Sequence, residues 1–140
     1  MGSPGFLGLS SRSVVGDIAE YTDQPRPVVV ENAVSAHDLV MADLNRFFSS
    51  MAGRQDAVDF MQERKDFGLT KYGVVLHADN GRNYPKDIAD EAGDLVAYLR
   101  VFLERHPEIG DIYWDQYISV LHFFVKFCGD RFELEKLDRS

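Results

Sequence analysis

Acidic residues recur twice in the sequence with the same spacing, four residues and then three. The two groups are Asp59, Glu63 and Asp66, and Asp87, Glu91 and Asp94. Because an α-helix turns about 100° per residue, each group covers an arc of roughly 60° and lies on one helical face. If the two helices pack antiparallel, up to six carboxylates share a cleft, and cations must then neutralise their repulsion. Oxygen ligands select hard ions, so the pattern predicts a site for Mg²⁺ or Mn²⁺.

A simpler interpretation of both acidic groups stays open. Carboxylates on helix surfaces are usually just solvated. Asp59 and Asp87 also stand near expected helix starts, where the helix macrodipole favours negative charge. On this interpretation the two groups belong to ordinary surface faces and bind no metal.

The stretch between the acidic groups, expected to be a loop from Leu69 to Pro85, supplies basic and polar side chains. The residues that could contact a substrate are Lys71, Tyr72, Asn80, Arg82, Lys86 and Asp87. The three cations could bind phosphate oxygens, and an arginine can do so bidentately. Tyr72 could stack on a base or pack in the core. Asn80 could bond to a base or sugar, although Asn80-Gly81 is also an ordinary turn sequence.

Helical periodicity predicts an all-α, four-helix bundle-like domain over residues 34–140, after an irregular segment over residues 1–33. Ser35 is expected to cap the first helix, Gly53 to end it and Gly68 to end the second. The expected helices cover residues 35–50, 56–67, 85–105 and 110–127, with a short frayed helix after Gly129.

The apolar positions of the later helices predict how they are buried. In the third helix the core stripe is expected at Ile88, Ala92, Leu95, Leu99 and Phe102. The fourth helix is apolar over much of its circumference, which predicts burial against the bundle and against another subunit. The three valines at residues 28–30 form either a short strand or an extended segment packed on the domain.

Length, charge and cysteine content narrow the possible classes of protein. The 140 residues fit one domain, and the net charge of −8 disfavours binding of a nucleic-acid polymer but not of a small phosphorylated ligand. No apolar run reaches the ~20 residues needed to span a bilayer. The sole cysteine, Cys128, is expected to be buried and inert, and a reducing cytoplasm is the expected location.

Three stretches of the sequence carry a resemblance to a known family. They are residues 63–73 with Lys71-Tyr72-Gly73, then Asn80-Gly81-Arg82, then residues 90–100 with Glu91-x-x-Asp94. Together they resemble the MazG-like proteins, often encoded by phages, which belong to the all-α nucleoside triphosphate pyrophosphohydrolases. The match covers about residues 56–104. Glu91 and Asp94 match the metal-binding pair of the family directly. In the preceding acidic cluster Glu63 matches, while Asp59 and Gln62 depart from the family pattern.

The resemblance implies hydrolysis of a nucleoside triphosphate between its α- and β-phosphates, by dimers or tetramers that use Mg²⁺. We expect Glu63, Glu91 and Asp94 to hold one or two ions, with Asp59 or Asp66 assisting. Glu63 is the expected acceptor of the proton from the attacking water, and the basic residues would offset charge on the leaving pyrophosphate.

Two other functions fit the same residues. The first is a helical module that binds a nucleotide or a protein partner without turnover, which the departures at Asp59 and Gln62 favour. The second is a structural oligomer whose carboxylates are only solvated.

Overall fold

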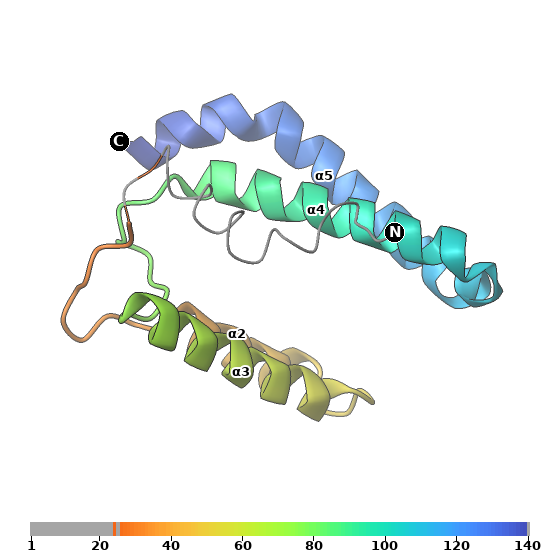
Figure 1. Ribbon diagram of the computed structural model, residues 1–140, viewed down its shortest axis with the longest axis horizontal. Helices are drawn as coiled ribbons and strands as arrows, with labels where there is room; N and C mark the ends of the chain where they lie inside the picture. Colours follow the sequence, from red (N-terminus) through yellow and green to blue (C-terminus); the bar gives the residue numbers. More distant parts are fainter. Residues whose placement is uncertain (1–23, 25, 140) are drawn as a thin grey trace. The chain divides into compact units, whose positions relative to one another are not determined.

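The structure is a computed structural model that describes residue 24 and residues 26–139, and the regular structure of these residues is entirely helical (Figure 1). The elements are α2 (Ala36–Phe47), α3 (Arg54–Tyr72), α4 (Tyr84–Arg105), the 3-10 helix η1 (Pro107–Ile109) and α5 (Gly110–Arg139). This confirms the all-α prediction with four main helices. The chain forms two compact units, one ending at Arg82 and the other beginning at Asn83. Residues 1–23 of the predicted N-terminal segment lie outside the described residues.

The first unit is built on the antiparallel pair α2 and α3 (Figure 1). As predicted, Ser35 caps α2: its side chain is buried and its Oγ accepts a hydrogen bond of 3.3 Å from the amide of Asp38. The helix ends at Phe47, so the prediction that Gly53 ends it was wrong. Gly53 instead precedes α3 directly, with a φ of 91° that suits glycine.

Helix α3 is longer than predicted because it continues through Gly68. A glycine inside a helix destabilises it by about 1 kcal/mol relative to alanine. Despite this cost, α3 continues beyond Gly68 through Leu69 to Tyr72. The helix stops at Gly73, whose φ of 73° and hydrogen bond of 2.8 Å to the carbonyl of Leu69 form a left-handed cap. Lys71 and Tyr72 therefore belong to the last turn of α3 and not to a loop.

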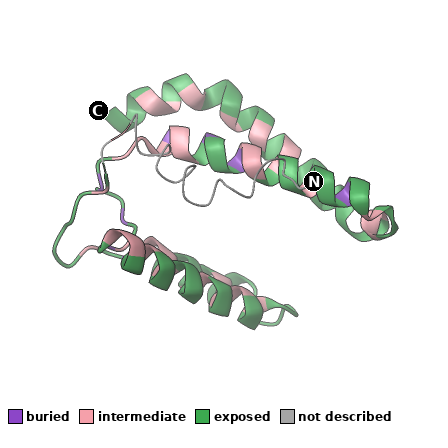
Figure 2. Ribbon diagram, in the orientation of Figure 1, coloured by how far each residue is buried: buried purple, intermediate pink, exposed green. Residues whose placement is uncertain are grey.

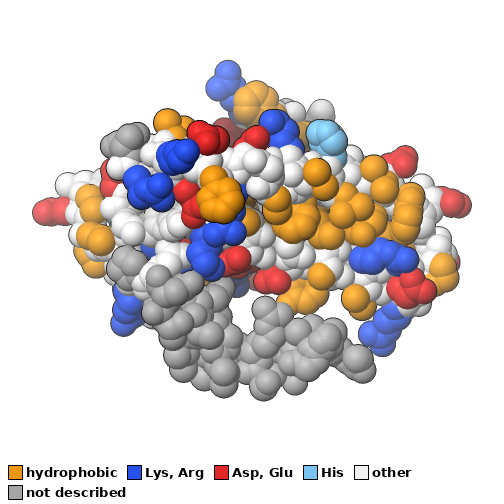
Figure 3. Space-filling model, turned by 90° about the horizontal axis from the view of Figure 1, so that it is seen from above, with side chains coloured by type: hydrophobic (Ala, Val, Ile, Leu, Met, Phe, Trp, Pro, Cys, Tyr) orange, Lys and Arg blue, Asp and Glu red, His pale blue; other side chains and the backbone are white. Residues whose placement is uncertain are grey.

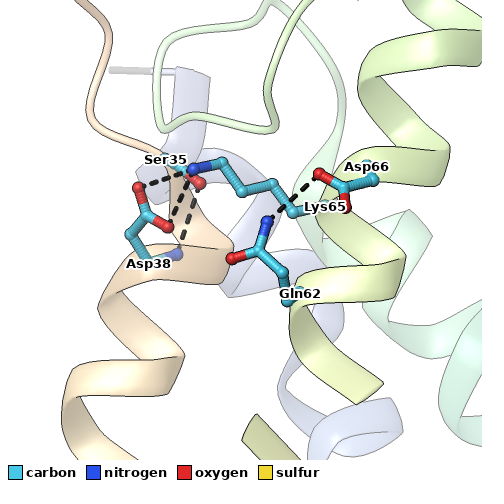
Figure 4. A network of polar contacts seen from close by, with 5 residues as sticks. All are labelled: Ser35, Asp38, Gln62, Lys65 and Asp66. Carbon is cyan, nitrogen blue, oxygen red and sulfur yellow. Dashed lines mark hydrogen bonds and ion pairs between the residues drawn. The ribbon is translucent and has the colours of Figure 1, made fainter. Parts of the chain in front are cut away.

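An ion pair between Lys65 and Asp38 joins the two helices of the first unit (Figure 4). From α3, the Nζ of Lys65 lies 3.0 Å from both carboxylate oxygens of Asp38 near the start of α2. At the other end of the helix pair, about three turns away along α3, the Nη1 of Arg54 donates to the Oδ1 of Asn45 at 2.9 Å. The lysine and aspartate side chains are 23% and 51% exposed, so the pair is worth at most about 1 kcal/mol and serves chiefly to fix register.

The second unit is built on the antiparallel pair α4 and α5, connected by η1 (Figure 1). Helix α4 begins after Asn83, whose Oδ1 accepts from the amide of Lys86 at 3.0 Å, and it ends before Pro107, close to the predicted bounds. Small residues let α5 approach α4. An added Cβ at Gly93 would lie 3.5 Å from the ring of Phe124, which is ordinary van der Waals contact.

The side of α4 that faces α5 differs from the predicted core stripe. The buried residues of the helix are Pro85, Ala89, Ala92 and Leu103. Of the predicted stripe, Ala92 is buried and Leu99 half-buried, but Ile88, Leu95 and Phe102 are 39%, 47% and 52% exposed. The buried series lies on a neighbouring stripe, where the small side chains of Ala89 and Ala92 permit the close approach of α5 and Leu103 fills the space near the end of the helix.

Helix α5 is continuous for 30 residues, a length of about 45 Å. The predicted break near Gly129 was therefore wrong. The ion pair between Lys126 and Asp130, 2.9 Å long, spans this glycine on the helix surface. Near the far end, Asn83 donates to Glu135 at 2.7 Å and ties the start of α4 to the last turns of α5. These contacts offset the cost of a glycine in mid-helix.

Burial is limited in both units, and most of each helix surface is exposed (Figure 2). Cys128 is exposed, so the prediction of a buried thiol was wrong. None of the described helices combines the length and apolar character required to cross a membrane.

Candidate functional site

The loop that follows α3 contains the most deeply buried polar side chains of the first unit. Asn80 is 0% exposed and His77 is 3% exposed. Buried polar groups are costly unless they are hydrogen-bonded, so their partners decide what the loop can do.

His77 anchors the loop to the extended segment at residues 26–30. Its Nδ1 accepts a hydrogen bond of 3.3 Å from the amide of Asp79, which places the ring proton on Nε2. Nε2 then donates to the carbonyl of Val28 at 2.8 Å. The amide of Val28 in turn donates to the carbonyl of Asn80 at 2.9 Å. The valine run is thus an extended segment and not a strand.

Asn80 closes the turn at the end of this loop. Its Oδ1 accepts from the amide of Arg82 at 3.0 Å, and Gly81 between them has a φ of 82°. A Cβ at Gly81 would approach the Cγ2 of Val28 to 3.2 Å, so both backbone conformation and space favour glycine here. The predicted turn at Asn80-Gly81 is confirmed.

The amide nitrogen of Asn80 is the unusual feature of the loop. Among the described residues, its Nδ2 has no hydrogen-bond partner although it is buried. An unmet buried donor costs about 1–3 kcal/mol, so such a group calls for an acceptor from outside the described chain. The loop therefore holds one preformed donor suited to an oxygen or ring nitrogen acceptor.

Two of the predicted substrate-binding residues stand beside each other at the end of α3. The ammonium of Lys71 lies 5.2 Å from the ring centre of Tyr72 and 5.5 Å from that of Phe67. Both Lys71 and Tyr72 are half-buried. A base that stacked on Tyr72 would therefore compete with a cation–π contact worth about 0.5–2 kcal/mol.

The remaining predicted substrate-binding residues divide between the two units. Arg82 is half-buried at the end of the first unit, next to the Asn80 turn. Lys86 and Asp87 stand in the first turn of α4. The Nζ of Lys86 already bonds to Asp90 at 2.8 Å, so binding a phosphate there requires this pair to open or to share its lysine.

The acidic group on α3 is exposed and lies away from α2. The residues of α3 on the α2 side include half-buried Met61 and Lys65, whereas Asp59, Glu63 and Asp66 are exposed. At 100° per residue the three acids centre roughly 150° from that side. Asp59 accepts a hydrogen bond from Gln55 at 2.9 Å, and Asp66 accepts one from Gln62 at 3.1 Å (Figure 4).

The acidic group on α4 has a similar position within its own unit. Asp87 and Asp94 are half-buried and Glu91 is exposed. The same helical geometry sets these residues roughly 150° from the stripe through Ala92 and Leu103 that packs on α5. The acidic group on α3 therefore lies far around that helix from its contact with α2, and the acidic group on α4 lies equally far around from its contact with α5.

Carboxylate oxygens of this kind fit a hard divalent cation chemically. Within the described residues, however, no three His, Cys, Asp or Glu side chains come close enough to hold one ion. The predicted ligands are divided, with Glu63 in the first unit and Glu91 and Asp94 in the second. The shared metal site consequently stays a prediction.

Sequence reasoning missed the role of His77. Nothing in its neighbourhood in the sequence shows a period that would mark it as buried. Its partner is the backbone of Val28, 49 residues earlier, and backbone partners leave no trace in residue types.

Comparison with known proteins identifies no relative of this chain. No family model, no curated protein and no solved structure matches it.

Proposed function

We propose that the chain hydrolyses (deoxy)nucleoside triphosphates to the monophosphate and pyrophosphate with Mg²⁺ or Mn²⁺, as its resemblance to the MazG-like family implies. The observation that supports this is the position of the acidic groups. Each group shares one face of its helix, roughly 150° from the side that packs on the neighbouring helix of the same unit. The residues between them, Lys71, Asn80 and Arg82, supply the cations and the buried donor that a nucleotide needs.

Glu63, Glu91 and Asp94 would hold the cation, with Asp59 or Asp66 adding a ligand. When bound, the ion would neutralise phosphate oxygens and lower the pKa of the attacking water. Glu63 would accept the proton of that water as it attacks the α-phosphorus. The bond from the α-phosphorus to its bridging oxygen breaks, and this oxygen leaves with the pyrophosphate.

The first unit would recognise the rest of the nucleotide. Lys71 and Arg82 would offset negative charge on the leaving pyrophosphate. The unmet Nδ2 donor of Asn80 suits a carbonyl oxygen of a base or a hydroxyl oxygen of the sugar. A ligand that lacked such an acceptor would leave this donor without a hydrogen bond and would therefore bind more weakly.

The test is to incubate the purified chain with each (d)NTP and either cation, and to follow pyrophosphate. Glu91→Gln and Glu63→Gln should each lower the rate by at least about 100-fold. The matched control is Glu104→Gln, an exposed glutamate on the same helix α4 that pairs with Arg100, and it should leave the rate unchanged. No cleavage of any nucleotide, or equal rates for Glu91→Gln and Glu104→Gln, would end the proposal.

One observation favours a second candidate, a module that binds nucleotide without turnover. Two of the three acids on α3 already accept hydrogen bonds from glutamines of the same helix, Gln55 and Gln62. Carboxylates held in this way are less available to a metal. Calorimetry separates the two functions, because micromolar nucleotide binding without any pyrophosphate release supports the module and contradicts the enzyme.

A further inference from the structure

The side-chain amide of Asn80 cannot meet its hydrogen-bonding needs with water, unlike the charged groups at the surface. On the face drawn in Figure 3, acidic and basic side chains lie interspersed at the surface. Asn80 is 0% exposed, and its Nδ2 has no hydrogen-bond partner among the described residues. Native proteins leave few buried donors unpaired, so such a group points to a bound molecule or to a functional role. The residues that surround it in the following argument all belong to the first unit.

The orientation of the Asn80 amide is fixed by its turn. Its Oδ1 accepts a hydrogen bond of 3.0 Å from the backbone amide of Arg82. Exchanging the positions of Oδ1 and Nδ2 would set the NH2 group against that N–H, so that two donors faced each other. Gly81, with its φ of 82°, holds the backbone of the turn in place. Nδ2 therefore offers two N–H donors and no acceptor to a molecule that approaches it.

A group that only donates can distinguish the nucleotide bases by their exocyclic groups. Guanine, thymine and uracil carry a carbonyl oxygen where adenine and cytosine carry an amino group. The carbonyl oxygen accepts from Nδ2, whereas the amino group would direct its own N–H toward it. An asparagine that reads adenine uses both Oδ1 and Nδ2, and here Oδ1 is already bonded to the backbone of Arg82. The Asn80 amide therefore suits a base with a carbonyl group.

A base can reach the buried amide only if part of the surrounding chain moves. The extended segment at residues 26–30 lies against the turn, because the amide of Val28 donates to the carbonyl of Asn80 at 2.9 Å. The carbonyl of Val28 in turn accepts from the Nε2 of His77 at 2.8 Å. The hydrogen bonds that tie this segment to the loop thus run through the backbone of one residue outside any helix. The segment can open locally while the helices stay folded.

We propose that Asn80 selects nucleotides whose base carries a carbonyl group, namely guanine, thymine or uracil. Its Nδ2 donates to that oxygen once the extended segment has moved away from the turn. The inference rests on the proposed function for the nucleotide nature of the ligand, and it adds the class of base. Binding supplies the partner that Nδ2 lacks within the described chain, whereas adenine and cytosine leave this donor unmet.

The first test measures binding without turnover. The ligands are the α,β-methylene analogues of dGTP, dTTP, dATP and dCTP, which cannot be cleaved between the α- and β-phosphates, and calorimetry with Mg²⁺ gives their affinities for the full chain. The dGTP and dTTP analogues should bind at least about 10-fold more tightly than the other two, because only they pair the buried donor. Equal affinities of the four analogues for the wild-type chain, or no binding of any, overturn the proposal.

A pair of asparagine variants assigns the preference to Asn80. Asn80→Asp keeps an oxygen for the amide of Arg82 but replaces the donor with an acceptor, so it should abolish the preference for the dGTP and dTTP analogues. The matched control is Asn45→Asp, since the Oδ1 of Asn45 only accepts from Arg54, and it should keep the wild-type preference. A folded Asn80→Asp chain with the wild-type preference contradicts the assignment.

The outcomes for base selection and for catalysis are separable. Cleavage of all four dNTPs together with equal affinities for their analogues would refute base selection and leave the hydrolase proposal standing. Preferential binding of the dGTP and dTTP analogues without cleavage of any dNTP would do the reverse.

The second test concerns the extended segment. Val28→Pro removes the N–H that bonds to the carbonyl of Asn80 and so favours the open segment. Its affinity for the dGTP analogue should rise by about fivefold, because a larger fraction of the chain is then open to the ligand. Val29→Pro introduces the same ring at the next position and should leave the affinity unchanged. Equal affinities of the two proline variants would show that this segment does not control access to Asn80.

Discussion

Gly81 and Gly68 are expected to respond to alanine in opposite directions. Gly81 has a φ of 82° in the turn that holds Asn80, a conformation that costs an alanine about 1–2 kcal/mol. Gly68 lies inside α3 with no atom within 4 Å of an added Cβ. Gly81→Ala should therefore destabilise the fold by about 1–2 kcal/mol, whereas Gly68→Ala should stabilise it by about 0.5–1 kcal/mol.

The cause of the Gly81 effect can be separated into strain and contact. An added Cβ would meet Val28 at 3.2 Å, but that valine is 48% exposed and its end can move. The double variant Gly81→Ala with Val28→Ala should thus keep most of the destabilisation. Urea unfolding followed by circular dichroism gives the free energies. A neutral Gly81→Ala, or full recovery in the double variant, would refute the argument from backbone conformation.

Three further predictions concern the helix pairs. Burial lowers the pKa of His37 below its usual 6.5, so the unfolded chain binds the proton more readily than the folded one. Stability should then be lost as the pH falls through about 6.5, and His37→Gln should flatten that dependence of the urea midpoint; identical slopes contradict it. A double-mutant cycle on Lys65 and Asp38 should give a coupling of about 0.2–1 kcal/mol that weakens in salt, and a coupling insensitive to salt argues against an ion pair. Asn83→Ala removes both the cap of α4 and the bond to Glu135, and should cost about 1–2 kcal/mol by thermal melting; a change within experimental error counts against both contacts.

Helix boundaries were predictable wherever a local signal sets them. Ser35 begins α2 because its hydroxyl bonds to an amide three residues later, and Pro107 follows the end of α4 because it cannot continue the helix. Gly68 and Gly129 resembled terminators, yet both lie inside helices. Whether such a glycine ends a helix depends on what the next turns pack against, and that is not a local property.

The candidate site was predictable only in part, for a related reason. Periodicity alone places each acidic group on one face of a predicted helix. The structure agrees that both groups are helical, one within α3 and the other within α4. Which side of α4 packs on α5 depends on the close approach allowed by Ala89 and Ala92, so the predicted core stripe was misplaced. The burial of Asn80 depends on a backbone segment more than 50 residues earlier in the chain, and residue types do not encode it.

The unbroken last turn of α3 has one more consequence for ligands. Glu63 and Lys71 are on the same rigid rod, and at a rise of 1.5 Å per residue they are about 12 Å apart along its axis. In a loop this separation could adjust to whatever entered. On a helix the separation is fixed, so a ligand that contacts both side chains must itself span about the same length.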